Sequence, residues 1–238
     1  MPKTGRLIKF DTTDPVSHLS SLEAIWRELD GKNTAPVLVF RHLDPCVLLG
    51  SSQVAGQAAD IAYCRSQNIP VIRRPSEGGT IYADENCLLY SLIVTVNKAA
   101  EVFEGFQNAI MASLAGLGLQ GKAKPPNDIL VNNKKIAGLT VTQWYSITSL
   151  SGTLLLDTDP INLDRIIGRG TAEKLVGVNQ FLPDKVKRVD LAAIITNKIE
   201  AWLGISFETT GLTGPEKEVA SELIAAKYGS EKWNRIQG

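Results

Sequence analysis

Residues 128–143 read DILVNNKKIAGLTVTQ, two strand-forming runs joined by the pair Asn132-Asn133. Asparagine tolerates positive φ, so an Asn-Asn pair suits the two central positions of a primed β-turn. The segment therefore predicts a β-hairpin with strands over Asp128–Val131 and Lys134–Gln143. This hairpin is the clearest local signal in the chain and indicates a β-sheet in its middle part.

Apolar runs around the hairpin predict further strands, and amphipathic runs nearer the two ends predict helices. Strands clustered in the middle with helices at the ends favour an α+β fold, a central mixed or antiparallel β-sheet flanked by helices. Strands are expected at about 37–40, 46–49, 80–82, 88–96 and 153–156, and helices at about 17–29, 57–68, 101–117, 191–203 and 216–228.

Composition narrows the classes of function. The 238 residues are 44% hydrophobic, enough for a sizeable core, and 25 basic residues balance 25 acidic ones, which disfavours a nucleic-acid binder with a basic surface. No apolar run reaches the roughly 18 residues of a membrane span, and the N-terminus lacks the apolar stretch of a secretory signal. Three cysteines without a CxxC pair and only two histidines argue against a disulfide framework and a multi-histidine metal site. We expect a cytoplasmic protein with no nucleic-acid and no membrane partner.

The first candidate site is the segment RRPSEGGTIY, residues 73–82. Glycines let a backbone approach a ligand closely with its N–H groups, and arginine offers a planar fork of donors suited to phosphate. Together they predict an anion cradle for a nucleotide, although an ordinary surface turn with two solvated arginines remains open from this segment alone. The candidate binding residues are Arg73, Arg74, Ser76, Gly78, Gly79, Thr80, Ile81 and Tyr82.

The second candidate is Lys135 on the second strand of the hairpin. Simple alternation places it on one face with Ala137, Leu139 and Val141. A lysine on so apolar a face requires an anionic partner if it is buried, whereas on a half-buried face it would reach out to water.

Asn127 and Asp128 precede the hairpin, where they either orient a nucleotide or magnesium ion or simply cap the start of a strand. Cys46, Cys64 and Cys87 are interpreted as small buried hydrophobes, because no Cys–His pairing follows from their spacing.

Five blocks occur in one order: 50–53 (GSSQ), 73–82, 88–91 (LLYS), 127–138 (NDI and KKIAG) and 152–155 (GTLL) with Asp157. Together they resemble the catalytic domain of the lipoate–protein ligase A family, in the superfamily that also holds biotin protein ligases and octanoyltransferases. The resemblance extends over roughly Leu7 to Trp233. It implies the biotin/lipoate ligase fold, which is like that of the class II synthetases.

The resemblance implies a two-step, ATP-dependent reaction. Lipoate, or a related acid such as octanoate, would form an acyl-adenylate with ATP, and a lysine of a lipoyl domain would then take the acyl group. By this resemblance Lys135 is the catalytic residue, in contact with both the carboxylate and the α-phosphate. The acceptor would be a lipoyl domain of a 2-oxoacid dehydrogenase or a glycine-cleavage-type protein. Nucleotide binding would also involve Asn127, Asp128 and Gly138, with Asp128 as the candidate Mg²⁺ ligand and the acyl chain near Leu88 and Val141.

The sequence departs from the family pattern at Glu77, Ala83, Leu89 and Ser151 and over residues 140–142. Because these positions cluster on the expected pocket, two alternatives stay open: an ATP-independent octanoyl or lipoyl transferase, and a catalytically weakened lipoate-binding homologue. The transferases use a cysteine nucleophile either shortly before the Asn127 region or well after the Lys135 strand, and no cysteine lies beyond Cys87.

Two regions are expected along the chain. Residues 1–209 would form the catalytic domain and residues 210–238 a helical appendage. The full accessory domain of longer family members is expected to be absent, so a separate accessory subunit is a candidate partner.

Overall fold

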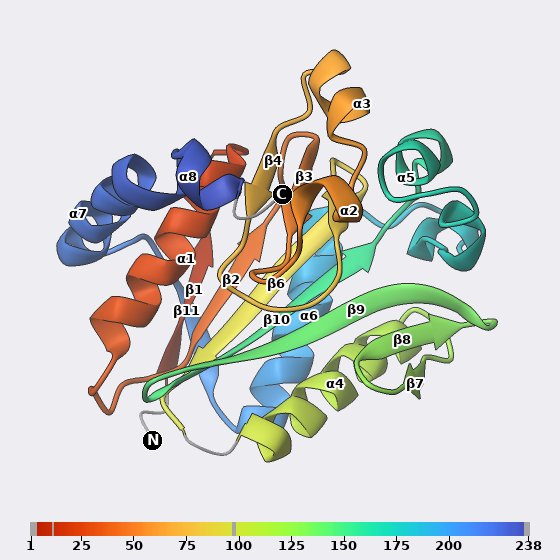
Figure 1. The fold of residues 1–238 in the computed structure, drawn as a ribbon. Helices are drawn as coiled ribbons and strands as arrows, with labels where there is room; N and C mark the ends of the chain where they lie inside the picture. The colour runs from red at the N-terminus through yellow and green to blue at the C-terminus, as the bar shows by residue number, and fades with distance from the viewer. Residues whose placement is uncertain (1–3, 11, 97–98, 236–238) are drawn as a thin grey trace.

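A large mixed β-sheet forms the centre of the protein. The computed structural model describes residues 4–10, 12–96 and 99–235. Along the sheet the strands follow the order β11 (Ser206–Thr210), β1 (Thr4–Lys9), β2 (Val37–Arg41), β6 (Cys87–Val94), β10 (Ile147–Leu155), β9 (Lys134–Trp144), β8 (Asp128–Val131) and β7 (Lys122–Lys124) (Figure 1). The first three strands are parallel to one another, and the other neighbours are antiparallel. The predicted α+β class with a mixed sheet is confirmed.

A second, three-stranded sheet carries the glycine-containing segment. Its order is β4 (Val71–Arg73), β3 (Cys46–Leu49) and β5 (Ile81–Ala83), with β3 at the centre. The helix expected over 57–68 is two short helices, α2 (Ala55–Ala58) and α3 (Ile61–Ser66). The break falls at Asp60, whose carboxylate accepts a hydrogen bond from the Tyr63 backbone N–H and so begins α3 as an N-cap.

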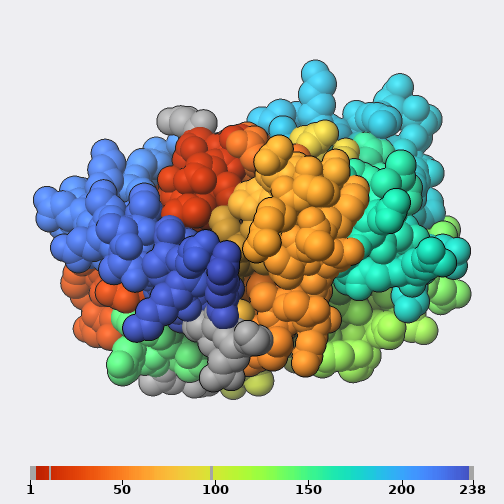
Figure 2. Space-filling view, turned by 45° about the horizontal axis from the view of Figure 1, so that its top comes forward, coloured from red at the N-terminus to blue at the C-terminus, as the bar shows by residue number. Residues whose placement is uncertain are grey.

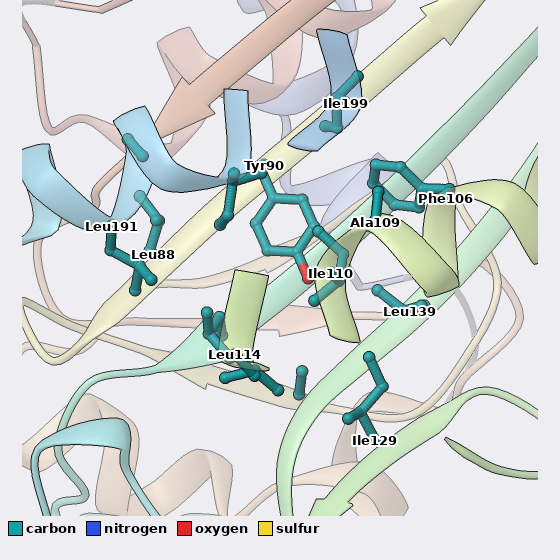
Figure 3. Close-up of a cluster of buried hydrophobic side chains, with 14 of the residues drawn as sticks. Leu88, Tyr90, Phe106, Ala109, Ile110, Leu114, Ile129, Leu139, Leu191 and Ile199 are labelled. Carbon is teal, nitrogen blue, oxygen red and sulfur yellow. The ribbon is translucent and has the colours of Figure 1, made fainter. Parts of the chain in front are cut away.

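Helices cover the two faces of the large sheet in separate layers. The helices α4 (Ala99–Ala115) and α6 (Arg188–Leu203) cover one face, where Tyr90 packs among residues such as Phe106 and Ile110 (Figure 3). The helix α1 (Pro15–Leu29) packs on the other face, against residues that include Ile93. Since side chains alternate along a strand, Leu88 and Tyr90 of β6 face α4 and α6, while Leu89 and Ser91 face the opposite side. The candidate site lies on that opposite side.

The C-terminal segment packs against the rest of the chain. The helix α7 (Gly214–Leu223) lies along α1, and a π-helical turn, Ile224–Tyr228, leads to the short α8 (Glu231–Asn234). Buried Glu216 pairs with Arg6, and the Trp233 indole N–H donates to the Arg73 carbonyl at 2.9 Å. Figure 2 shows this dark blue segment beside the orange segment that leads into β4. Residues 160–180 hold the remaining short helices, α5 (Pro160–Ile166) and two 3₁₀ turns, Ala172–Lys174 and Val178–Gln180.

The hairpin that the sequence predicts is confirmed. Asn132 and Asn133 have φ of 50° and 63°, the left-handed conformations that a primed turn requires. The ladder between β8 and β9 contains a register shift opposite Ile129 and Leu130, which leaves Ile136 as an extra residue in β9. Among the described residues, no helix combines the length and apolar character needed to cross a bilayer.

Candidate functional site

A cavity of about 250 Å³ lies on the α1 side of the large sheet. Its floor includes a row of four residues that are paired across adjacent strands: Gly138 on β9, Thr153 on β10, Leu89 on β6 and Arg41 on β2. Its walls come from α1, from the turn between β4 and β5, and from residues 163–175. The cavity therefore joins segments that are far apart in the sequence.

The glycine turn, residues 74–80, lines the cavity as predicted, and Arg74 holds its shape. The Arg74 guanidinium donates to the carbonyls of Glu77 and Gly79 at 3.0 and 2.8 Å and to the Leu48 carbonyl at 2.9 Å. Burial lowers the pKa of Arg74 to about 10. Because these donors are occupied by carbonyl groups, Arg74 fixes the turn. The groups of the turn that remain able to contact an anion are its backbone N–H groups and hydroxyls.

The loop after β3 supports this turn from behind. A Cβ added at Gly50 would lie 2.1 Å from the Gly78 carbonyl oxygen, so the two backbones meet at a distance that only glycine allows. Gln53 adds a hydrogen bond from its amide to the Thr80 hydroxyl at 3.1 Å. The turn is thus held in position by backbone packing as well as by Arg74.

Glu77, which replaces a glycine of the family pattern, turns toward the loop after β3. Its carboxylate accepts hydrogen bonds from the hydroxyls of Ser51 and Ser52. These hydrogen bonds, the one from Ser51 first, lower the pKa of Glu77. The negative charge is therefore held by two hydroxyl donors from the loop after β3.

Arg73 lies away from the cavity, contrary to its predicted role as a binder of nucleotide. Its guanidinium donates to the carbonyls of Gly50 and Ser51 at 2.7 and 3.1 Å and to that of Trp233 at 3.2 Å. Neighbouring residues of an extended strand point to opposite faces, so Arg73 and Arg74 have different surroundings. Arg73 joins the small sheet to the C-terminal segment.

Lys135 lines the cavity, but on a different face of β9 from the one expected. The extra residue at Ile136 reverses the alternation, and the Lys135 ammonium lies 3.0 Å from the position that a Cβ of Gly138 would occupy. The absence of a side chain at Gly138 thus leaves room for the lysine. The ammonium pairs with the Asp128 carboxylate at 2.7 Å, and 38% of the lysine side chain is exposed. Lys135 is therefore a partly exposed amine that lines the cavity, not a buried one.

Two residues expected near the acyl chain lie elsewhere. Val141 is 38% exposed at the surface, and Leu88 packs on the α4 side of the sheet. The β-bulge in β9 and the alternation along β6 explain both differences. On the cavity side the apolar lining comes from other residues: Leu89 and Leu155 of the sheet, and Leu19, Leu22 and Trp26 of α1.

Asn127 lines the cavity, and Asp128 lies at its edge beside Lys135. The Asn127 amide donates to the Leu139 carbonyl at 2.6 Å, which ties the start of β8 to β9. Within the described ranges, no group of three or more histidine, cysteine, aspartate or glutamate side chains is placed to hold a metal ion. Asp128 is thus a single carboxylate ligand at most, not part of a protein cage.

The three cysteines are buried away from the cavity, as expected for small hydrophobes. Burial raises the pKa of the Cys46 and Cys64 thiols and raises that of Cys87 to about 12. None of the three lines the cavity. A thiol nucleophile at this site is not available from these residues.

Comparison with known proteins gives one consistent family. The model of the lipoyl protein ligase A/B catalytic domain matches residues 14–199. Lipoate-protein ligase A subunit 1 of Thermoplasma acidophilum is 27% identical over 97% of this chain and 96% of its own. The octanoyltransferase LipM of Bacillus subtilis is 22% identical over 98% of each chain.

Solved structures agree with the sequence comparisons. A lipoate-protein ligase A bound with ATP has a TM-score of 0.91 and 26% identity, covering 98% of each chain. A bipartite lipoate protein ligase of Thermoplasma acidophilum, analysed with its E2 lipoyl domain, also has a TM-score of 0.91 and 26% identity, and covers 98% of this chain and 97% of that one. Both extend over almost the whole chain, the C-terminal segment included.

Proposed function

The chain belongs to the family of lipoyl protein ligase A/B catalytic domains, and on that premise we propose that it is an ATP-dependent lipoate–protein ligase. It activates lipoate, or a related medium-chain acid, and transfers the acyl group to a lysine of a lipoyl domain. The observation that carries the proposal is the shared cavity of Lys135 and the glycine turn. An amine and a set of backbone N–H groups on one cavity suit an acid carboxylate beside a nucleotide phosphate.

The first step forms the mixed anhydride. A carboxylate oxygen of the acid attacks the α-phosphorus of ATP, the bond from that phosphorus to the bridging oxygen of the β-phosphate breaks, and pyrophosphate leaves with the electron pair. Lys135 exchanges its ion pair with Asp128 for the carboxylate and the α-phosphate, and stabilises the negative charge that develops on their oxygens. Its partial exposure suits this exchange, because a half-solvated ion pair is weakly held.

The second step moves the acyl group. The neutral amine of the acceptor lysine attacks the acyl carbon, AMP leaves, and the amide nitrogen loses a proton to solvent. Lys135 again lies beside the oxygens that gain charge. The amide formed on the acceptor is the product.

Magnesium is proposed to bind together with ATP. Mg²⁺ in nucleotide sites is usually held by one or two carboxylates together with substrate phosphates, and Asp128 at the cavity edge fits that arrangement as a single carboxylate. The ion would offset charge on the phosphates during nucleophilic attack.

The relatives suggest the protein partners. A lipoyl domain, of a 2-oxoacid dehydrogenase or a glycine-cleavage-type protein, is the proposed acceptor, by analogy with the Thermoplasma acidophilum ligase analysed with its E2 lipoyl domain. The bipartite organisation of that ligase supports a separate accessory subunit as a second partner.

An ATP-independent octanoyl or lipoyl transferase is the second candidate, because LipM proteins match along almost the whole chain. That reaction needs a nucleophile to carry the acyl group. The buried cysteines with raised pKa values do not supply one at the cavity, which favours the ligase.

The test is mass spectrometry of a lipoyl domain incubated with the protein, lipoate, ATP and magnesium, with pyrophosphate release measured in parallel. We expect Lys135→Met to reduce pyrophosphate release on the order of 100-fold or more, the loss typical of a group that stabilises transition-state charge. Lys134→Met is the matched control, because Lys134 is exposed on the same strand and does not line the cavity. Undiminished release by Lys135→Met, or acyl transfer from an octanoylated carrier without ATP, would overturn the ligase assignment.

A further inference from the structure

The last helix of the chain, α8, completes the edge of the small sheet. β4 lies at that edge with β3 as its neighbour, and the backbone of Arg73 in β4 faces outward. The Arg73 N–H donates to the Asn234 side-chain oxygen at 2.9 Å, and the Trp233 indole N–H donates to the Arg73 carbonyl at 2.9 Å. An open strand edge would leave both backbone groups to water. Two side chains of α8 therefore take the place of a further strand (Figure 2).

The Arg73 side chain extends this contact to the loop after β3, residues 50–53. Its buried guanidinium donates to the carbonyls of Gly50 and Ser51, and also to the Trp233 carbonyl. Hydrogen bonds from a charged donor are roughly twice as strong as neutral ones. Arg73 therefore ties α8 to the loop after β3.

The loop after β3 in turn holds the glycine turn. The Ser51 N–H donates to the Ser76 carbonyl at 3.0 Å, and the Ser51 hydroxyl donates to the Glu77 carboxylate. Gly50 lies so close to Gly78 that a Cβ would not fit between them. Because the two segments are in contact along their length, a displacement of the loop is expected to displace the turn.

We propose that α8 is part of the nucleotide site, with Trp233 and Asn234 as positioning residues that act through Arg73 and the loop after β3 on the glycine turn. The inference rests on the proposed function, because it takes the glycine turn to bind the phosphates of ATP. Trp233 and Asn234 do not line the cavity, so they do not touch a substrate held in it. They set the fraction of molecules in which the turn has the shape that binds ATP. The apparent affinity for a ligand falls in proportion to that fraction.

The rest of the C-terminal segment is anchored independently of Arg73. α7 packs along α1, and buried Glu216 pairs with Arg6 of β1 at 2.7 Å. Lys227 pairs with Glu23 of α1 at 2.6 Å. Loss of the α8 contacts to Arg73 should therefore loosen the loop after β3 and leave the segment docked on α1.

Calorimetry with the intact protein and magnesium tests the inference without turnover. The probe is α,β-methylene-ATP, titrated into the wild type, Trp233→Phe, Asn234→Ala and the double variant. Trp233→Phe keeps an aromatic ring and removes the indole N–H. We expect each single variant to bind the analogue about 3- to 5-fold more weakly and the double variant about 10-fold more weakly, the values of lost hydrogen bonds to backbone groups. Lipoate binding should stay within about 2-fold of the wild type, because the apolar lining of the cavity comes from other residues.

Two controls separate positioning from a general loss of stability. Lys232→Ala changes an exposed residue of the same helix and should keep the wild-type affinity for the analogue. Thr213→Ala removes the hydroxyl that caps α7 at the Glu216 N–H, and so lowers the melting temperature without a change at Arg73. If Thr213→Ala weakens nucleotide binding as much as the double variant does at an equal loss of melting temperature, the segment acts through overall stability and the inference is wrong.

A double-mutant cycle with Gly50→Ala tests the path. The added Cβ displaces the glycine turn directly, since it would lie 2.1 Å from the Gly78 carbonyl oxygen. Residues that act through one network have non-additive effects. On the Gly50→Ala background the double variant of α8 should therefore lower kcat/KM for ATP by less than about 2-fold, against about 10-fold on the wild-type background. Additive losses would mean that α8 does not act through the loop after β3.

Hydrogen–deuterium exchange of the ligand-free protein separates this inference from the proposed function. The N–H groups of Ser51 and Arg74 donate to the carbonyls of Ser76 and Leu49 at 3.0 and 2.9 Å. We expect both amides to exchange about 5- to 10-fold faster in the double variant and at the wild-type rate in Thr213→Ala. Faster exchange together with a wild type that does not bind ATP would contradict the ligase and keep the coupling. A wild type that releases pyrophosphate with lipoate and ATP, while exchange and ATP affinity are unchanged in the double variant, would keep the ligase and contradict the inference.

Discussion

Replacement of Gly50 by alanine tests whether the glycine turn binds the nucleotide. The added Cβ would lie 2.1 Å from the Gly78 carbonyl oxygen, whereas real Cβ contacts are not shorter than 3.0 Å. The turn must therefore move by at least 0.9 Å, the difference between these distances. The turn cannot absorb this shift locally, because Arg74 holds the carbonyls on both sides of Gly78.

A shift of about 1 Å in a positioning group costs on the order of 100-fold in rate. We therefore expect Gly50→Ala to lower kcat/KM for ATP about 100-fold, equivalent to about 2.7 kcal/mol. Binding of the acid alone should change much less, since the apolar lining around Leu89 and Trp26 does not touch Gly50. Pyrophosphate release at varied ATP gives the first quantity, and calorimetry with lipoate gives the second.

Gly56→Ala is the matched control, because a Cβ at Gly56 in α2 meets nothing within 4 Å. Thermal melting of both variants checks that the fold persists. A folded Gly50→Ala variant with wild-type kcat/KM for ATP would refute the reasoning, since a displaced turn would then have no effect on the nucleotide.

Two further predictions concern stability. The Tyr90 hydroxyl is buried against α4 without a hydrogen-bond partner (Figure 3). Tyr90→Phe should therefore raise the free energy of unfolding, measured by urea titration, by about 1 kcal/mol. A destabilised variant would contradict the assigned burial of the hydroxyl. Burial lowers the pKa of His18 to about 4. Between about pH 6.5 and pH 4 the unfolded chain therefore binds a proton that the folded chain does not. The free energy of unfolding should fall as the pH falls through this interval, by up to about 3 kcal/mol. His18→Gln should show a smaller loss between pH 7 and pH 5, and an unchanged pH dependence in that variant would refute the assignment.

Sequence patterns predicted the turns and elements whose conformation depends mainly on neighbouring residues. The Asn132-Asn133 turn was predictable because asparagine accepts positive φ, and both residues adopt it. Strands β1 and β11 were not predicted. The residues of β11, Ser206–Thr210, are mostly polar and exposed, and their pairing is with a strand about 200 residues earlier in the chain. Pairing at that separation depends on the assembled fold, which local periodicity does not record.

The sequence predicted those site residues that stand out by their type and their place in a local element. The glycine turn and Lys135 were found this way, and both line the cavity. The face of Lys135 was predicted wrongly, because a single extra residue at Ile136 reverses the alternation of a strand. Arg73 and Arg74 were both predicted to bind nucleotide, but alternation along the strand points them to opposite sides, and Arg73 meets the C-terminal segment instead of the cavity. Arg41 gave no local signal, since its surroundings come from α1 and β6.

The departures from the family pattern fall into two groups with different consequences. Glu77 keeps its negative charge, and the hydroxyls of Ser51 and Ser52 hold its carboxylate toward the loop after β3. Ser151, by contrast, lines the cavity, and its hydroxyl lies 2.7 Å from the Ser91 hydroxyl, which accepts a hydrogen bond from Arg41. The first group leaves the shape of the turn intact. The second changes side chains that line the sheet side of the cavity, so the departures bear on which acid is bound rather than on the nucleotide turn.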